Sequence, residues 1–125
     1  MKAMLLATGV GIFTLASQPT LASDRPAHFK GEAIASQQQA LSTFAETNAK
    51  LTAILAGELN PTTMTEVHQL TYTLENALAL IPAADDEIKE VLEEVHLGSE
   101  SMDAERIRSN GEYYLQGRIH RPEFC

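Results

Sequence analysis

The sequence predicts an all-α protein, an up-down bundle of four helices that follows a cleaved signal peptide. Two observations predict this fold. Apolar residues recur at helical spacing over most of the chain after residue 31, and short segments with Gly, Pro, Asn or Asp interrupt that pattern at a few places. The sequence has no alternating β-branched run and no Asn-Gly hairpin, which are typical of strands. A chain of 125 residues suffices for one domain with one core.

The first 22 residues have the pattern of a secretory signal peptide. Lys2 gives the charged start, and the apolar run of residues 3–16 that follows is too short to span a bilayer as a permanent helix. Pro19 ends this run, and Ala22 is a small residue where signal peptidase accepts one. We therefore expect cleavage near Ala22 and a location in a bacterial periplasm. No later stretch is apolar enough to span a membrane, so we expect no membrane contact after cleavage.

The mature chain is expected to begin with an extended lead-in and a long first helix. Residues 23–31 contain Pro26 and Gly31 and have no periodicity, which predicts the lead-in. The first helix is expected over residues 32–56, before Gly57 breaks it. Its apolar stripe consists of Ile34, Leu41, Phe44, Ala45, Leu51, Ile54 and Leu55.

The second helix is expected over residues 62–80. Asn60 or Thr62 can cap it, and Pro61 is favoured at a first helical position. Pro82 closes it. The stripe that should face the core consists of Val67, Leu70, Leu74, Ala77, Leu78 and Ile81.

The remaining chain predicts two further helices. Asp85 and Asp86 place negative charge at the start of the third helix, where the helix dipole favours it, and the apolar stripe then runs toward Gly98. A fourth helix should begin after a cap at Asp103, although the third and fourth could be one bent helix, which would make a bundle of three. The bundle domain is thus expected over residues 32–120, with a loose tail at residues 121–125.

The composition excludes several classes of partner and activity. The formal net charge is −8, and removal of Lys2 with the signal peptide makes it −9. Such an excess of carboxylates repels nucleic acid and attracts cations and basic protein partners. Nucleophile motifs and glycine-rich phosphate loops are absent from the sequence, so we expect a non-enzymatic binding protein for a partner protein or a divalent metal. Cys125 is the single cysteine and could link two chains into a dimer.

Two histidines form the strongest candidate for a binding site. His68 lies 14 residues before Pro82 and His96 lies 14 residues after it, so an antiparallel hairpin centred on Pro82 brings them to one height. Both lie on the flank of an apolar stripe, and the two flanks face each other. Glu93 and Glu100 are within one helical turn of His96. Histidine and glutamate are ligands of divalent transition metals, which predicts a metal site at His68, His96, Glu93 and Glu100.

The same hairpin places Glu75 opposite Lys89, since each is seven residues from Pro82. A ferritin-like di-iron site would need Glu-x-x-His on two helices, and the residue three before His68 is Thr65. The simpler alternative to a metal site is a pair of flank histidines that pack and hydrogen-bond the seam between two helices.

Two resemblances accompany these inferences. Residues 24–31 (DRPAHFKG), 67–78 (VHQLTYTLENAL) and 92–97 (LEEVHL) resemble a family of short exported bacterial proteins of unknown function. This resemblance implies a helical periplasmic protein and supplies no activity. More distantly, the chain resembles the soluble periplasmic b-type cytochromes, four-helix bundles that hold haem between a Met near the start of the first helix and a His near the end of the last. His120 is near that His position, but the first helix has no methionine.

Overall fold

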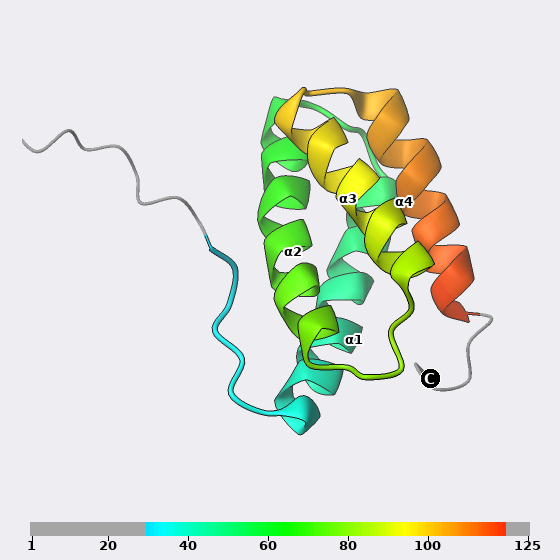
Figure 1. Cartoon of the computed structure of the whole chain (residues 1–125). Helices are drawn as coiled ribbons and strands as arrows, with labels where there is room; N and C mark the ends of the chain where they lie inside the picture. The colour runs from blue at the N-terminus through cyan, green and yellow to red at the C-terminus, as the bar shows by residue number, and fades with distance from the viewer. Residues whose placement is uncertain (1–29, 120–125) are drawn as a thin grey trace, which may run out of the picture.

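The computed structural model describes residues 30–119 and contains four α-helices in this range. They run alternately up and down, and α3 and α4 are separate helices (Figure 1). The elements are α1 (Gln37–Leu55), α2 (Pro61–Ala79), α3 (Asp86–Glu100) and α4 (Ala104–Ile119). The all-α bundle of four is thereby confirmed. Several predicted features lie outside the described residues: the signal peptide with its cleavage near Ala22, the haem-position residue His120, the tail at 121–125 and the dimer-forming Cys125.

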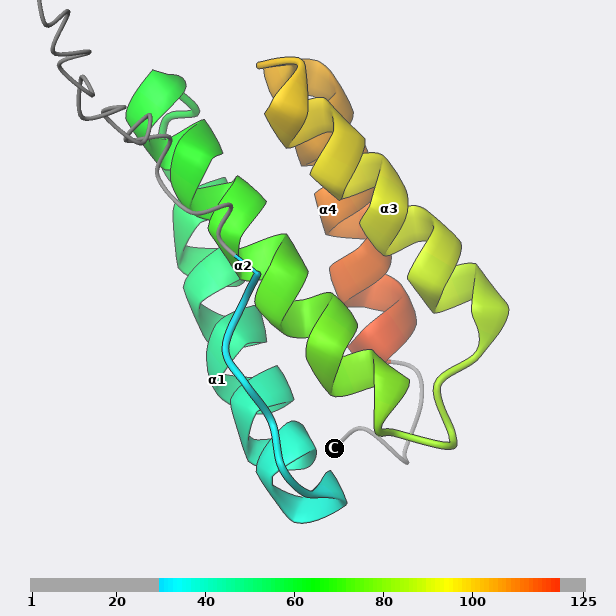
Figure 2. The same ribbon diagram turned by 60° about the vertical axis from the view of Figure 1, so that its left-hand side comes forward.

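Helix α1 begins five residues later than the sequence pattern predicts. Ser36 ends the extended segment, because its Oγ accepts a hydrogen bond from the Gln39 backbone N–H at 3.1 Å and so caps the helix. The preceding residues lie along α2 instead (Figure 2). The Glu32 N–H donates to Thr73 Oγ1 at 3.2 Å, and Asn76 Nδ2 donates to the Lys30 carbonyl at 2.8 Å. Residues 30 and 32, at the described end of this segment, are thus fastened to α2 by side chains of that helix.

Helices α2 and α4 begin at capping residues that the sequence predicts, and α3 begins at Asp85, for which the sequence predicted only a favourable charge at the helix start. Asn60 Oδ1 accepts from two backbone N–H groups at the start of α2, with Pro61 as the first helical residue. Asp85 accepts from the Ile88 N–H at 3.0 Å, and Asp103 accepts from the Arg106 N–H at 3.0 Å. Each cap satisfies donors that a helix end otherwise leaves without partners, so these boundaries follow from local chemistry.

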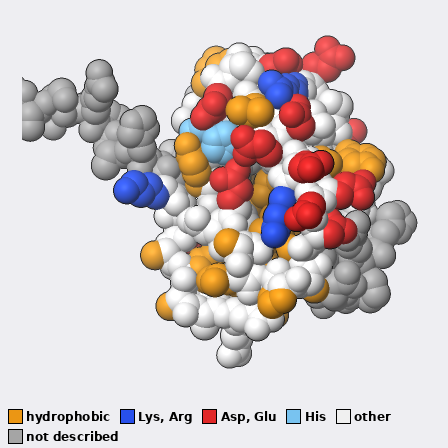
Figure 3. Space-filling model, in the orientation of Figure 1, with side chains coloured by type: hydrophobic (Ala, Val, Ile, Leu, Met, Phe, Trp, Pro, Cys, Tyr) orange, Lys and Arg blue, Asp and Glu red, His pale blue; other side chains and the backbone are white. Residues whose placement is uncertain are grey.

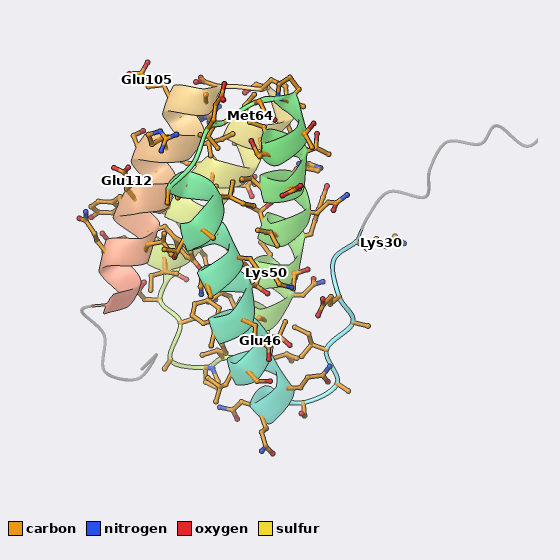
Figure 4. The ribbon with its side chains drawn as sticks, turned by 180° about the vertical axis from the view of Figure 1, so that it is seen from behind. Lys30, Glu46, Lys50, Met64, Glu105 and Glu112 are labelled. Atoms are coloured by element: carbon orange, nitrogen blue, oxygen red, sulfur yellow. The ribbon has the colours of Figure 1, made fainter. Side chains whose placement is uncertain are left out.

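The core confirms the predicted stripe of α2 and corrects that of α1. Leu41 and Ala45 were expected to face the core but are exposed. The buried face of α1 instead includes small and polar residues, namely Ala40, Thr43, Thr47 and Asn48, beside the expected Phe44 and Leu51. Helix α1 packs against both α2 and α4. Its buried face therefore includes polar residues of α1 that hydropathy alone would place at the surface. Glu46 and Lys50 lie on the outer side of α1 (Figure 4).

Helix α3 runs through Gly98 and ends at Glu100, with its C-cap at Ser101. Gly98 is buried within the helix at the contact with α4, and a Cβ there would lie 3.1 Å from the backbone nitrogen of Ile107. The absence of a side chain at this glycine therefore allows α3 and α4 to approach closely, and the glycine does not end the helix. Among residues 30–119, no helix has the length and hydropathy needed to cross a membrane.

Candidate metal centre

The candidate site lies on the seam between α2 and α3. Within each helix, its residues are spaced three or four apart and so share one face. Helix α2 contributes His68, Thr71, Tyr72 and Glu75, and α3 contributes His96, Ser99 and Glu100. In the space-filling view, the histidine side chains reach the surface among acidic side chains (Figure 3).

The structure brings His68 and His96 together, as the hairpin arithmetic predicts. Their ring centroids are 4.9 Å apart, with an angle of 57° between the ring planes. His96 is buried, with 7 % of its surface exposed, and His68 is half-buried. Tyr72 packs against both rings in edge-on geometry, with centroid distances of 5.0 Å to His68 and 4.6 Å to His96. The two imidazoles are therefore fixed in place rather than free to rotate.

Two hydroxyl groups determine which nitrogen of each imidazole carries a proton. Ser99 Oγ donates its proton to the His96 carbonyl at 2.5 Å, so it can only accept from His68 Nδ1, which lies 3.1 Å away. Thr71 Oγ1 likewise donates to the His68 carbonyl at 2.7 Å and accepts from His96 Nδ1 at 3.1 Å. With the hydroxyl protons placed in this way, both Nδ1 atoms are N–H donors, while the 3.1 Å contact of His96 Nε2 with Glu100 Oε1 favours a second proton on His96. In the neutral imidazole, each Nε2 then carries a free lone pair, the form in which histidine binds a metal.

Glu100 completes a group of three candidate ligands. Its Oε1 lies 3.1 Å from His96 Nε2. One ligand atom from each of His68, His96 and Glu100 lies within 4.8 Å of the other two. Ligands of a tetrahedral zinc ion are separated by about 3.3 Å, given metal–ligand bonds of about 2.0 to 2.1 Å. The three atoms would therefore have to move closer together, chiefly through the exposed Glu100 side chain, to bind one ion.

The fourth predicted ligand, Glu93, is not part of this group of three. It lines a neighbouring hollow of about 280 Å³ together with Glu75 and Lys89. Glu75 and Lys89 thus face the same space, as the hairpin predicts, but among the described residues no ion pair joins them. Glu75 Oε1 instead lies 3.2 Å from His96 Nδ1.

The contact between Glu75 and His96 is electrostatic rather than a well-formed hydrogen bond. Glu75 Oε1 is buried without a hydrogen-bond partner, since the Nδ1 proton is directed to Thr71. Burial raises the pKa of Glu75, and the nearby positive charge that His96 can carry opposes this rise. Glu93 and Glu100 add to the rise through charge repulsion. When ionised, Glu75 favours the Nδ1–H form of His96 and so reinforces the lone pair at Nε2.

The pKa of His68 is shifted in the direction that favours metal binding. Burial lowers it, the neighbouring His96 lowers it further, and the Glu100 carboxylate opposes both effects. A neutral imidazole is the form that coordinates a metal, so a lowered pKa reduces competition from protons.

A surface hollow opens directly beside the ligands. Its volume is about 390 Å³. It is lined by Thr65, His68, Tyr72, Ser99, Glu100 and Met102. The hollow gives ions and small ligands a route from solvent to His68 and Glu100.

Sequence reasoning did not identify Thr71, Ser99 and Tyr72 as members of the site. A pattern was nevertheless present, because a hydroxyl residue follows each histidine at the third position, as in His68-x-x-Thr71 and His96-x-x-Ser99. At this spacing a hydroxyl can bond back to the histidine's own carbonyl. What the sequence could not show is that each hydroxyl then accepts from the histidine of the other helix.

The fold and site define an all-α four-helix bundle with a His-His-Glu group on the seam between two helices. Comparison with known protein families identifies the family of the chain. It belongs to a family of unknown function, DUF6746, whose family model matches residues 1–120. No curated protein and no solved structure matches the chain, and the distant resemblance to b-type cytochromes gains no support from these comparisons.

Proposed function

We propose that this protein is an exported, non-enzymatic binding protein that holds a divalent transition metal ion between α2 and α3. His68, His96 and Glu100 are the proposed ligands. The observation that carries the proposal is the convergence of their three ligand atoms within 4.8 Å. The proton assignments support it, because they leave a free Nε2 lone pair on each neutral imidazole.

The contact between His96 and Glu100 supports the proposal of a bound cation at this place. When His96 is neutral, its Nε2 lone pair lies 3.1 Å from a carboxylate oxygen that also offers only lone pairs. Two acceptors at this distance repel each other unless a cation lies between them. Either a proton or a metal ion can supply that positive charge. The net charge of −8 adds long-range attraction for cations.

The alternative is that His96 is protonated and forms an ion pair with Glu100 that only stabilises the seam. Metal binding distinguishes the two. A metal that binds only the folded state at about 100 times its Kd adds about 2.7 kcal/mol of stability, which raises the Tm of a domain of this size by about 10 to 20 °C. The measurement is thermal unfolding by circular dichroism, with chelator or with Zn²⁺, Cu²⁺ or Ni²⁺.

Matched variants assign the effect to the site. His68→Ala, His96→Ala and Glu100→Gln should each abolish the metal-dependent rise in Tm, since each removes one of three ligands. Glu93→Gln removes a nearby carboxylate outside the group and should keep the rise. Glu100 is exposed, so its variant should fold even if loss of the buried His96 does not allow folding. A Tm in the wild type that no metal changes would refute the proposal and favour the ion pair.

A further inference from the structure

We infer that the site selects copper, with the Met102 thioether as a fourth ligand that provides affinity for Cu⁺. The inference rests on the proposed metal site and specifies its metal. The observations that carry it are the position of Met102 on the hollow beside the histidines and the unusual backbone conformation in which Met102 is held.

Met102 occupies a turn position that favours glycine. After α3, the Met102 N–H bonds to the Ser99 carbonyl at 3.3 Å and the Asp103 N–H bonds to the Gly98 carbonyl at 2.9 Å. These two bonds form a Schellman motif, in which the residue at the Met102 position adopts a left-handed conformation. Met102 has a φ of 54°, and it is the one non-glycine residue with positive φ among residues 30–119. A side chain with a Cβ disfavours this conformation, so the turn itself gives no reason for methionine.

Packing in the core also gives little reason for a methionine at position 102. Met102 is 48 % exposed, whereas the other methionine in the described part of the chain, Met64, is 6 % exposed in the core. The Met102 side chain lines the hollow that His68 and Glu100 also line. A flexible thioether thus shares the hollow with one proposed imidazole ligand and the proposed carboxylate ligand, from which it can reach toward an ion held there.

The set of donor atoms then determines the metal. Thioether sulfur is a soft ligand that selects Cu⁺, and imidazole binds copper in either oxidation state. Zn²⁺ is bound in proteins by thiolate, imidazole and carboxylate, so it can use His68, His96 and Glu100 and gains little from a thioether. Met102 would also close the coordination sphere on the side of the hollow. A closed sphere without a position for substrate is typical of a site that binds rather than catalyses.

The test compares Cu⁺ and Zn²⁺ affinity in Met102→Leu. Cu⁺ is kept reduced with ascorbate under anaerobic conditions and titrated against a chromophoric competitor, and Zn²⁺ is titrated in the same way. Leucine retains the apolar bulk that shields the hollow and lacks the sulfur. We expect the variant to lose about tenfold or more in Cu⁺ affinity and to keep Zn²⁺ affinity within about twofold. Met64→Leu, which removes the buried sulfur, should leave both affinities unchanged.

X-ray absorption of the Cu⁺-loaded protein gives a direct measurement. A sulfur neighbour of copper should be present in the wild type and in Met64→Leu and absent in Met102→Leu. Equal Cu⁺ affinity in the wild type and Met102→Leu, or copper without a sulfur neighbour, would overturn the role of Met102 while the metal site stands. Zn²⁺ binding without Cu⁺ binding would overturn the selection of copper. Failure of both metals to bind would overturn the proposed function together with this inference.

Discussion

Replacement of Leu74 by alanine measures how much the burial of this side chain contributes to the free energy of unfolding. Leu74 is on α2 and is 0 % exposed. Truncation therefore loses the full transfer free energy of the removed atoms and adds a cavity, for a typical cost of about 2 to 5 kcal/mol. Helix α2 packs against both α1 and α3, so it cannot move toward one neighbour to fill the cavity without leaving the other. We therefore expect a loss in the upper part of this range, about 3 to 4 kcal/mol.

The matched control is Leu41→Ala on α1. Leu41 is 41 % exposed, and alanine has the higher helix propensity, so we expect a loss below about 1 kcal/mol. The assay is urea unfolding followed by far-ultraviolet circular dichroism, with the free energy extrapolated to water and the m-values compared. If Leu74→Ala cost no more than Leu41→Ala at equal m-values, the burial argument would be wrong and the packing of α2 would have to be reconsidered.

Two further predictions concern pH and export. Because the pKa of His68 is lowered from 6.5 in the folded state, the unfolded state binds more protons, and stability should fall as the pH drops through 6.5 toward the folded pKa. Urea unfolding in chelator between about pH 8 and pH 5.5 should show a smaller loss in His68→Gln; equal losses in both proteins would contradict the assigned shift. The neighbouring groups whose charges shift the pKa of His68 are His96, which lowers it, and Glu100, which raises it. For export, N-terminal sequencing of the mature protein should begin at or near Ser23, and a mature pool that begins at Met1 would disprove cleavage.

The features that the sequence predicted correctly depend on local chemistry or on a short hairpin. Asn60 and Asp103 cap helices because their side chains bond to backbone N–H groups two or three residues away. The pairing of His68 with His96 required only an antiparallel hairpin of two helices, which leaves little freedom in register. Such predictions need no knowledge of the other two helices.

The features that the sequence did not reveal depend on contacts between distant segments. The lead-in extends to Ser36 because Thr73 and Asn76 on α2 hold it, and this pairing has no local pattern. Asn48 is fully buried in α1, where polarity suggested a surface position. In the site, the sequence does not distinguish Thr71 and Ser99 from other polar residues of a helix. Their importance comes from contacts with the histidine of the other helix, which only the structure shows.

The reciprocal contacts of Thr71 and Ser99 link the fold to the proposed binding function. Each hydroxyl is fixed by the carbonyl of the histidine on its own helix and accepts from the histidine of the other helix. A shift of α2 against α3 by one turn would break both cross-helix bonds at once, so the register of the seam and the orientation of the two imidazoles are set together. The folded protein thus orders the two histidine ligands before any ion arrives, which reduces the entropic cost of binding. For the same reason, a change that loosens the seam should weaken metal binding even where no ligand is altered.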